Sequence, residues 1–573
     1  MTEIQTSQTN SKKPLRLKLK KIPVPMASKP SISISLYDYQ IPHKERLDAI
    51  LDKNAFALDF SVMGSGKTYT SAYIYLENRF QRFKRMLVIT TVTGKNKWIE
   101  VIAKYNVPKT RVLSYSEIRS TKFKQPTHGL LTRNDFIEYR RNKRVFFPRV
   151  MIQDEKVTFY CTPEYLQMVN DGLLLIIDEI QNLKNNSNQS EACTSLVLPI
   201  VEQYKKDPVN AKSRFILLSS TPIDETTQSV RIFRLLGILT EEKLIQYIPS
   251  NNSAQLVGLR QILDFCYSHI NETEVCEVYA RYHPYVGKVS PRIELPQYYQ
   301  FSCYQIFDQL IKKYFGHSME SIPNQSKINI VKAFYRLYNP SDLELLKQGI
   351  RLLIQNSGYD IATRQIVKIP YDGNNFSLPE INQALMMIET AKIGLLTRIA
   401  KTKLEQNPNL KVVICVNYSQ TIDDLMNLLS VYNPLRLDSR VSKLQRSIAI
   451  THFQDKTNQY RLLIGNIRIC NSGIDLDDQD GRFPRFCLVN PNYSPIELEQ
   501  MCHRFNRCGT KSDTTIHFVF ETNNSEDNIL RELSYQSGTT LSDKIALDGY
   551  ACWYESDEIT PESKSADTWV PST

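Results

Sequence analysis

One short stretch near the N-terminus restricts the possible fold more than any other part of this 573-residue chain. It is Ser61-Val-Met-Gly-Ser-Gly-Lys-Thr68, with an apolar run, Ala55 to Phe60, before it and a helical pattern, Tyr69 to Glu77, after it. A strand, a glycine loop and a helix in this order form a phosphate cradle, because loop N–H groups and the positive end of the helix dipole face the phosphates. The full pattern opens with a glycine, and here that position is Ser61.

The residues of this loop have distinct predicted roles. Lys67 reaches the β- and γ-phosphates, and the hydroxyl of Thr68 is a ligand for Mg²⁺. Gly64 and Gly66, with Ser65 between them, let the backbone approach the nucleotide where a Cβ would collide. The sequence therefore predicts ATP and Mg²⁺ as cofactors.

A glutamine ahead of the loop is a second candidate for nucleotide binding. Gln40 lies about 25 residues before the glycine loop and just before a helical stretch, His43 to Leu51. Its amide offers both a donor and an acceptor, the pair that is needed to recognise the edge of an adenine. The alternative is that a glutamine at the start of a helix has no function.

Polar residues follow the next predicted strand, Met86 to Thr91. The hydroxyls of Thr91 and Thr93 and the ammonium groups of Lys95 and Lys97 are suited to binding a phosphodiester backbone. Trp98, by contrast, is expected to pack into the core. Further on, six basic residues between positions 133 and 149 are either an insertion that faces nucleic acid or an ordinary solvated face.

Two carboxylates follow the buried strand that begins at Leu173. Asp178 can hold Mg²⁺ through water, and Glu179 can orient and deprotonate an attacking water. The alternative is a strand that happens to end in two acidic residues at a turn.

A third strand, which begins at Arg214, ends in hydroxyl residues and a proline. Ser219, Ser220 and Thr221 can hydrogen-bond the acidic motif and couple loss of the γ-phosphate to the nucleic-acid site. Without the two earlier motifs, an ordinary polar turn would be the better interpretation. Up to this point the chain alternates strands and helices, which predicts a parallel sheet covered by helices.

Helical periodicity dominates from 236 to 385, after which strands and helices alternate again. Asp475 follows a predicted strand and can bind a ribose hydroxyl or order neighbouring arginines. Arg504 and Arg507 are three residues apart and would share one face of a helix, where they could clamp a phosphoryl group bound by another lobe. The alternative is a solvated basic helix.

Composition narrows the class of partner. The net charge of +11 favours a polyanionic partner, although a soluble basic protein is the simpler alternative. The eleven cysteines include no C-x-x-C pair, and no apolar run reaches 18 residues. We therefore expect an intracellular protein without a membrane partner, in a nucleus, a cytoplasm or a virion.

These motifs, in this order, resemble those of superfamily 2 helicase-type ATPases with two RecA-like lobes. Within that superfamily they are most similar to the SWI/SNF-type DNA translocases, which carry M-G-x-G-K-T as in Met63–Thr68, and R-L-D-G where this chain has Arg436-Leu-Asp-Ser439. The spacing of Gln500, Arg504 and Arg507 matches the sixth motif. The resemblance implies that Gln500 belongs to the catalytic site and that Arg507 is an arginine finger with Arg504 beside it.

The chain also departs from the family pattern. The acidic motif is D-E-I-Q, the third motif is S-S-T-P, and the fifth keeps one of two glycines, which weakens the assignment of Asp475. The basic insertion and the divergent middle resemble helicase-like transcription ATPases of large DNA viruses.

The resemblance and the residues together predict an α/β fold of two RecA-like parallel-sheet lobes with a largely helical insertion between them. The predicted divisions are a basic tail, a first lobe, an insertion through which protein partners could bind, a second lobe and a polar tail, at 1–30, 31–235, 236–385, 386–545 and 546–573. We expect an ATP-dependent motor on nucleic acid, with duplex DNA favoured over RNA. The alternatives are a strand-separating DNA or RNA helicase and a non-hydrolysing nucleic-acid-binding subunit of a transcription complex.

Overall fold

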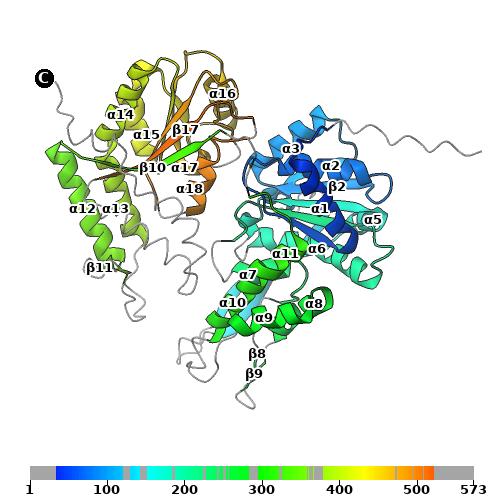
Figure 1. The fold of residues 1–573 in the computed structure, drawn as a ribbon. Coiled ribbons are helices and arrows are strands. Elements are labelled where there is room, and N and C mark those ends of the chain that lie inside the picture. The colour runs from blue at the N-terminus through cyan, green and yellow to red at the C-terminus, as the bar shows by residue number, and fades with distance from the viewer. Residues whose placement is uncertain are drawn as a thin grey trace, which may run out of the picture.

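The chain forms two α/β lobes that lie side by side, each built around one parallel sheet (Figure 1). The computed structural model describes residues 34–521 except 120–128, 142–150, 184–186, 224–227, 242–243, 245, 249–252, 256, 283–294, 321, 323–325, 358, 361–364, 367–377, 471–473, 493–494 and 508. Both predicted tails lie outside these residues. The two parallel-sheet lobes confirm the predicted fold class.

The first lobe contains a five-stranded sheet in the order β1-β7-β6-β2-β3, with every neighbouring pair parallel. Its strands are apolar because helices cover both faces of the sheet. The strands are β1 (Phe56–Asp59), β2 (Arg85–Thr90), β3 (Thr110–Ser114), β6 (Leu173–Asp178) and β7 (Arg214–Leu218). The helices are α1 (Gln40–Lys53), α2 (Lys67–Asn78), α3 (Val92–Lys104), α4 (Tyr115–Ile118), α5 (Pro163–Asp171), α6 (Asn188–Lys206) and α7 (Gln228–Leu235). The predicted motifs therefore sit at the carboxyl ends of neighbouring strands, where ligands bind in open parallel sheets.

The second lobe contains a six-stranded parallel sheet in the order β10-β17-β16-β13-β15-β14. Its strands are β10 (Ile328–Tyr335), β13 (Lys411–Val416), β14 (Leu435–Leu437), β15 (Leu462–Asn466), β16 (Arg485–Val489) and β17 (Thr514–Glu521). Its helices are α12 (Pro340–Ser357), α13 (Leu378–Ala391), α14 (Ile393–Gln406), α15 (Ser419–Leu428), α16 (Lys443–Gln454), α17 (Ile467–Cys470) and α18 (Pro495–Cys502).

The segment predicted as one helical insertion, 236–385, is mostly helical but divides between the two cores. Its first helices pack into the first lobe, where Phe307 contacts Phe233 and Phe315 contacts Phe56. These helices are α8 (Val257–His269), α9 (Glu272–Tyr282), α10 (Leu295–Ile306) and α11 (Lys312–Phe315). Its later part, β10, α12 and α13, belongs to the second core. Strand β10 pairs with β17, about 180 residues away, and local periodicity does not reveal so distant a partner.

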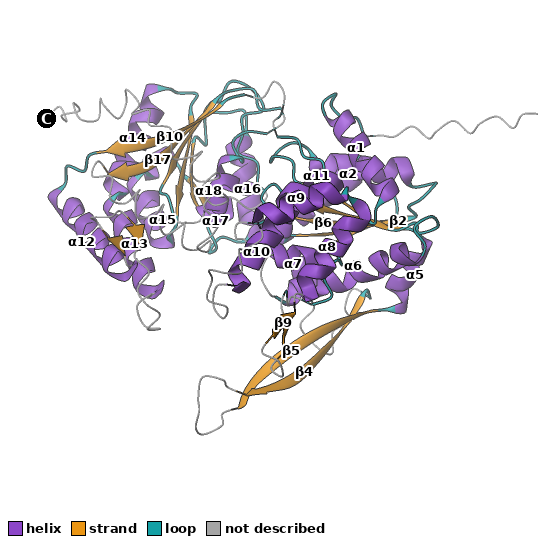
Figure 2. Ribbon diagram, turned by 60° about the horizontal axis from the view of Figure 1, so that its bottom comes forward, coloured by secondary structure: helices purple, strands orange, loops and turns teal. Residues whose placement is uncertain are grey.

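A long antiparallel hairpin of β4 (Leu131–Arg141) and β5 (Met151–Cys161) carries Arg133, Arg140 and Arg141 of the predicted basic stretch. The other three basic residues of that stretch lie outside the described residues. Figure 2 shows this hairpin projecting away from the first lobe. Two further short antiparallel pairs are β8 (Gln246–Ile248) with β9 (Ser253–Gln255), and β11 (Tyr359–Asp360) with β12 (Gln365–Ile366). In the described part of the chain, no helix is both long enough and apolar enough to span a membrane.

Candidate active site

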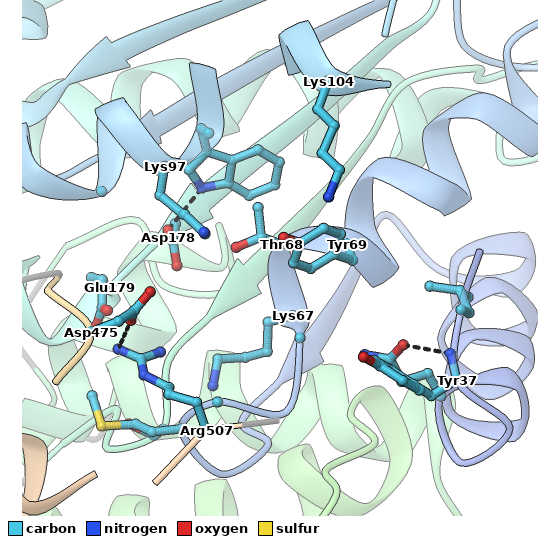
Figure 3. A pocket seen from close by; sticks show the side chains of 18 of the residues that line it. Tyr37, Lys67, Thr68, Tyr69, Lys97, Lys104, Asp178, Glu179, Asp475 and Arg507 are labelled. Carbon is cyan, nitrogen blue, oxygen red and sulfur yellow. Dashed lines mark hydrogen bonds and ion pairs between the residues drawn. The ribbon is translucent and has the colours of Figure 1, made fainter. Parts of the chain in front are cut away.

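A cavity of about 540 Å³ lies where the two lobes meet. The first lobe contributes the glycine loop, the start of α2, part of α3 and the acidic motif at the end of β6. The second lobe contributes Asp475, Gln479, Arg504 and Arg507. Figure 3 shows Lys67 and Thr68 on one side of this space and Arg507 reaching in from the other lobe.

The two glycines of the loop both adopt left-handed backbone conformations, with φ of +78° at Gly64 and +92° at Gly66. A Cβ on Gly64 would lie 3.2 Å from the Cα of Arg507, and a Cβ on Gly66 would lie 2.1 Å from Nε2 of Gln40. The glycines therefore also allow close approach of the second lobe and of α1, in addition to the predicted approach of a nucleotide.

The lysine of the loop is bonded to the loop itself. Nζ of Lys67 donates to the backbone oxygens of Ser61, at 2.6 Å, and of Val62, at 3.2 Å. Burial lowers the pKa of Lys67, while the nearby acids, Asp59 first among them, oppose this shift. This bonding holds the ammonium group beside the cavity in which phosphates would bind.

Gln40 is almost fully buried and connects α1 with the glycine loop. Its Nε2 donates to the backbone oxygen of Ser65 at 2.7 Å, and its Oε1 accepts from the backbone N–H of Tyr37 at 3.0 Å. A side-chain amide has two donor and two acceptor positions, so one of each is used here. The adenine contact of Gln40 remains a prediction. The structure adds that this side chain links the glycine loop to the residues before α1.

The first carboxylate of the acidic motif is held in a fixed orientation. Oδ2 of Asp178 accepts from Nε1 of Trp98 at 2.9 Å and from Oγ1 of Thr90 at 3.1 Å. Burial, followed by the charge of Glu179, raises the pKa of Asp178 to about 6. Trp98 is 1% exposed, so it packs into the core as predicted and also orients this carboxylate.

The second carboxylate belongs to a residue with unusual backbone geometry. Glu179 has a φ of +63°, and its carbonyl oxygen accepts from both the backbone N–H and Nδ2 of Asn182, at 3.1 and 2.9 Å. Such a conformation costs a non-glycine residue about 1–3 kcal/mol and tends to occur at functional sites. The two bonds from Asn182 fix the backbone at Glu179, and the residue lines the cavity.

A chain of hydrogen bonds runs from Glu179 into the second lobe. Nε2 of Gln181 donates to the carboxylate of Glu179, and Oε1 of Gln181 accepts from Oγ of Ser219 at 2.7 Å. Ser219 also accepts from the backbone N–H of Thr221 at 3.1 Å, and Oγ1 of Thr221 accepts from Nε2 of Gln500 at 3.4 Å.

This chain joins Ser219 and Thr221, which were predicted as one motif, to Gln500, which was predicted from another motif. Ser220 lines the cavity beside them. The sequence-based prediction missed Gln181. A signal was available: Gln181 is the last residue of D-E-I-Q, and the family pattern has a histidine, not an amide, at that position.

The prediction that Arg504 and Arg507 share a helix face is wrong. Helix α18 ends at Cys502, so Arg504 lies in a turn and Arg507 lies beyond it. Both residues nevertheless line the cavity. Three-residue spacing predicts a shared face only where the helix continues.

The two arginines have different environments. Nη2 of Arg507 lies 3.1 Å from Oδ1 of Asp475 and 3.4 Å from the backbone oxygen of Ile474, so Asp475 orders an arginine. Burial, followed by the charge of Arg507, lowers the pKa of Arg504 to about 10. Arg504 therefore keeps its charge at neutral pH.

Of the four residues predicted to contact nucleic acid, one lines the cavity and three make contacts elsewhere in the first lobe. Lys97 lines the nucleotide cavity (Figure 3). Thr91 caps α3 by accepting from the N–H of Gly94 at 3.0 Å and contacts Thr93 at 3.2 Å, while Lys95 pairs with a glutamate at 2.7 Å. Binding of a phosphodiester backbone by Thr91, Thr93 and Lys95 stays a prediction.

A buried polar cluster that no sequence motif predicts lies behind the glycine loop. Nε2 of His43 lies 3.1 Å from Oδ2 of Asp59, and Nδ1 of His43 lies 2.7 Å from Nδ1 of His317. Burial disfavours the charged form of Asp59, but the hydrogen bond and charge of His43 outweigh it and lower the pKa of Asp59. Two facing ring nitrogens at this distance share one proton, so a second protonation would place two donors against each other.

This histidine pair predicts a loss of stability at acid pH. Burial, followed by the charges of His43 and Arg46, lowers the pKa of His317, and Asp59 opposes them. The unfolded chain then binds the proton more readily than the folded one, so stability falls as pH drops below about 6.5, the ordinary histidine value. We expect His317→Asn, whose amide can replace Nδ1 without titrating, to lose less melting temperature between pH 7 and pH 5.5 than the native chain. Parallel curves for the two proteins would contradict this prediction.

Comparison with known proteins adds a family match in the second lobe. The family described as "Helicase conserved C-terminal domain" matches residues 391–509. Over 506 residues the chain is 24% identical to a putative ATP-dependent RNA helicase of Acanthamoeba polyphaga mimivirus, a match that covers 88% of this chain and 82% of the relative.

The chain also matches a yeast protein over a shorter stretch and resembles a solved archaeal structure at low identity. Over 147 residues the chain is 27% identical to the DNA repair and recombination protein RAD54 of Saccharomyces cerevisiae. This match covers 25% of this chain and 16% of that protein. The solved SWI2/SNF2 ATPase core of Sulfolobus solfataricus, in complex with dsDNA, has a TM-score of 0.29 and 12% identity, and covers 92% of this chain and 97% of that chain. In its motif order, its two parallel-sheet lobes and its matched C-terminal domain, the chain is similar to helicase-like ATPases of superfamily 2, including those of the SWI/SNF type.

Proposed function

We propose that the chain is a motor that uses ATP hydrolysis to move along duplex DNA. One observation carries this proposal: the cavity is lined by the glycine loop and two carboxylates from one lobe and by two arginines from the other. Hydrolysis at such a site needs both lobes, so each turnover would close and reopen the space between them. Repeated closure on a bound strand gives directed movement.

The residues of the cavity have complementary roles in this proposal. Lys67 binds the phosphates, and Glu179 accepts a proton from the attacking water. Thr68 and Asp178 offer a hydroxyl and a carboxylate in one cavity, which suits Mg²⁺ because this ion prefers oxygen ligands. When bound, Mg²⁺ would neutralise charge on the phosphates. Arg507, with Arg504 beside it, would stabilise the charge of the transferring phosphoryl group.

Duplex DNA is the favoured nucleic acid in this proposal, because the motifs resemble those of the SWI/SNF-type DNA translocases. The yeast relative is named a DNA repair and recombination protein, whereas the mimivirus relative is named an RNA helicase. That last name keeps a strand-separating RNA or DNA helicase as the second candidate. Protein partners would bind through the segment predicted as an insertion, residues 236–385.

The proposal is tested by steady-state ATP hydrolysis of the purified chain. The rate is measured alone and with blunt duplex DNA, single-stranded DNA or RNA at equal nucleotide concentration, and Glu179→Gln serves as the inactive reference. Stimulation mainly by duplex DNA supports the proposal, and stimulation mainly by single strands or RNA supports the second candidate. Turnover that is absent under all four conditions would reject both and favour a non-hydrolysing subunit.

A further inference from the structure

Helix α3 and the residue after it present one face to the nucleotide cavity. The residues of this face that line the cavity are Gly94, Lys97, Trp98, Lys104 and Tyr105. Successive members are three, one, six and one residues apart, which matches the turns of an α-helix, so their side chains share one side of it. The helix therefore brings two lysines to the cavity, Lys97 and Lys104.

Close contacts hold the first part of this face against the acidic motif. Gly94 packs on Thr90, since a Cβ on Gly94 would lie 2.4 Å from Oγ1 of Thr90. Oγ1 of Thr90, at 3.1 Å, and Nε1 of Trp98, at 2.9 Å, both donate to Oδ2 of Asp178. Lys97 lies between Gly94 and Trp98 along the helix, so its backbone is fixed beside Asp178.

The side chain of Lys97 enters the cavity. Figure 3 shows it pointing into this space toward Asp178. Its ion pair in the described part of the chain is with Glu100, where Nζ lies 3.5 Å from Oε2 and the two side chains are 42% and 64% exposed. An exposed pair of this kind contributes little to stability, so a phosphate group can take the place of the glutamate.

Lys104 belongs to another, aromatic part of the cavity. Its Nζ lies 5.2 Å from the centre of the Tyr105 ring, and that ring meets the Tyr69 ring edge-on with centres 6.1 Å apart. Figure 3 shows Lys104 pointing toward Tyr69. Aromatic side chains suit a nucleobase, whereas Thr68 and Asp178 offer oxygen atoms near which phosphates and their cation would lie. Of the two lysines, Lys97 is therefore the one at the phosphate end.

We propose that Lys97 binds the terminal phosphate of ATP, in place of the nucleic-acid contact that its position after a strand predicted. This inference rests on the proposed function. Lys67 enters the cavity from the glycine loop and Arg507 from the second lobe, and Lys97 adds a cation from a third element, α3. A lysine in this place binds ATP more tightly than ADP, because ADP lacks the terminal phosphate.

The test measures nucleotide affinity of the full chain with Mg²⁺ and without nucleic acid. Lys97→Met removes the ammonium group, keeps an unbranched stem and preserves helix propensity at a partly exposed site. We expect the Kd of a fluorescent, non-hydrolysable ATP analogue to rise about tenfold, as for loss of one charged hydrogen bond, while the Kd of a fluorescent ADP analogue stays within twofold. Equal changes in the two Kd values, or no change in either, would overturn the proposal.

Two lysines of the same helix are the matched controls. Lys95 lies on another face of α3 and pairs with Glu117 at 2.7 Å, so Lys95→Met should change neither Kd. Lys104→Met should leave the ratio of the two Kd values unchanged, because this lysine lies at the aromatic part of the cavity. A change of that ratio in either control as large as in Lys97→Met would show a general effect of charge and overturn the proposal.

Binding of duplex DNA separates the proposed role from the predicted nucleic-acid contact. We expect Lys97→Met to leave the Kd for a fluorescent duplex, measured without nucleotide, within twofold of the native value. Weaker DNA binding with native nucleotide affinities would overturn the proposal. These measurements need no turnover: if the native chain binds both analogues but does not hydrolyse ATP, the proposed function fails and the Kd values still decide the role of Lys97. A native chain that binds neither analogue would reject both.

Discussion

Arg507→Ala is expected to lower the ATP turnover number by a factor of about 10³–10⁵, the range over which arginine fingers act. The side chain enters the cavity from the second lobe, and the backbone of Arg507 lies close to Gly64 of the first lobe. The charge that develops on the phosphoryl group would then lack its donor from the second lobe. Nucleotide binding should change little, because Lys67 and the loop remain.

The measurement is kcat from steady-state hydrolysis together with Kd from titration of a fluorescent ADP analogue. Arg507→Lys keeps the charge without the planar fork and should recover only part of the rate. Arg482→Ala is the matched control, since this exposed arginine of the second lobe pairs with Asp480. A kcat for Arg507→Ala within tenfold of the native value would remove Arg507 from the catalytic site.

Glu179→Gln is expected to lower turnover by about 10²–10⁴, the usual contribution of a general base. The amide has the shape of the carboxylate and can still bond to Gln181, but it cannot accept the proton of the attacking water. The bonds from Asn182 to the backbone are unaffected, so the strained conformation is kept.

Two comparisons make this result specific. Glu202→Gln, an exposed change in α6 of the same lobe, should leave turnover unchanged. Gln181→Ala should give an intermediate loss, because it breaks the hydrogen-bond chain toward Thr221 and leaves the base in place. Glu179→Gln with native turnover would show that another group takes the proton.

Most of the fold could be predicted, because strand order along the chain and apolar periodicity are local properties. The loop Ser61–Thr68, the acids at 178–179 and the hydroxyls at 219–221 all appear at strand ends, as expected for a parallel sheet. The spacing of the sixth family motif correctly predicted that Arg504 and Arg507 line the cavity. The helix that was expected to carry them ends earlier, at Cys502.

What could not be predicted depends on contacts between residues distant in sequence. The pairing of β10 with β17, the contact of His43 with His317 and the bond from Met319 to Ser61 each join segments more than 150 residues apart. Gln181 is different: it lies within a predicted motif, but its bond to Ser219 depends on β6 and β7 being neighbours in the sheet.

The placement of β10 has a consequence for how the lobes can be separated. A fragment that begins at residue 386, the predicted boundary of the second lobe, would lack β10 and would expose the unpaired backbone edge of β17. Open strand edges of this kind recruit other chains and promote aggregation. A second lobe prepared for study on its own should therefore begin near Ser326, so that its sheet keeps its own outermost strand.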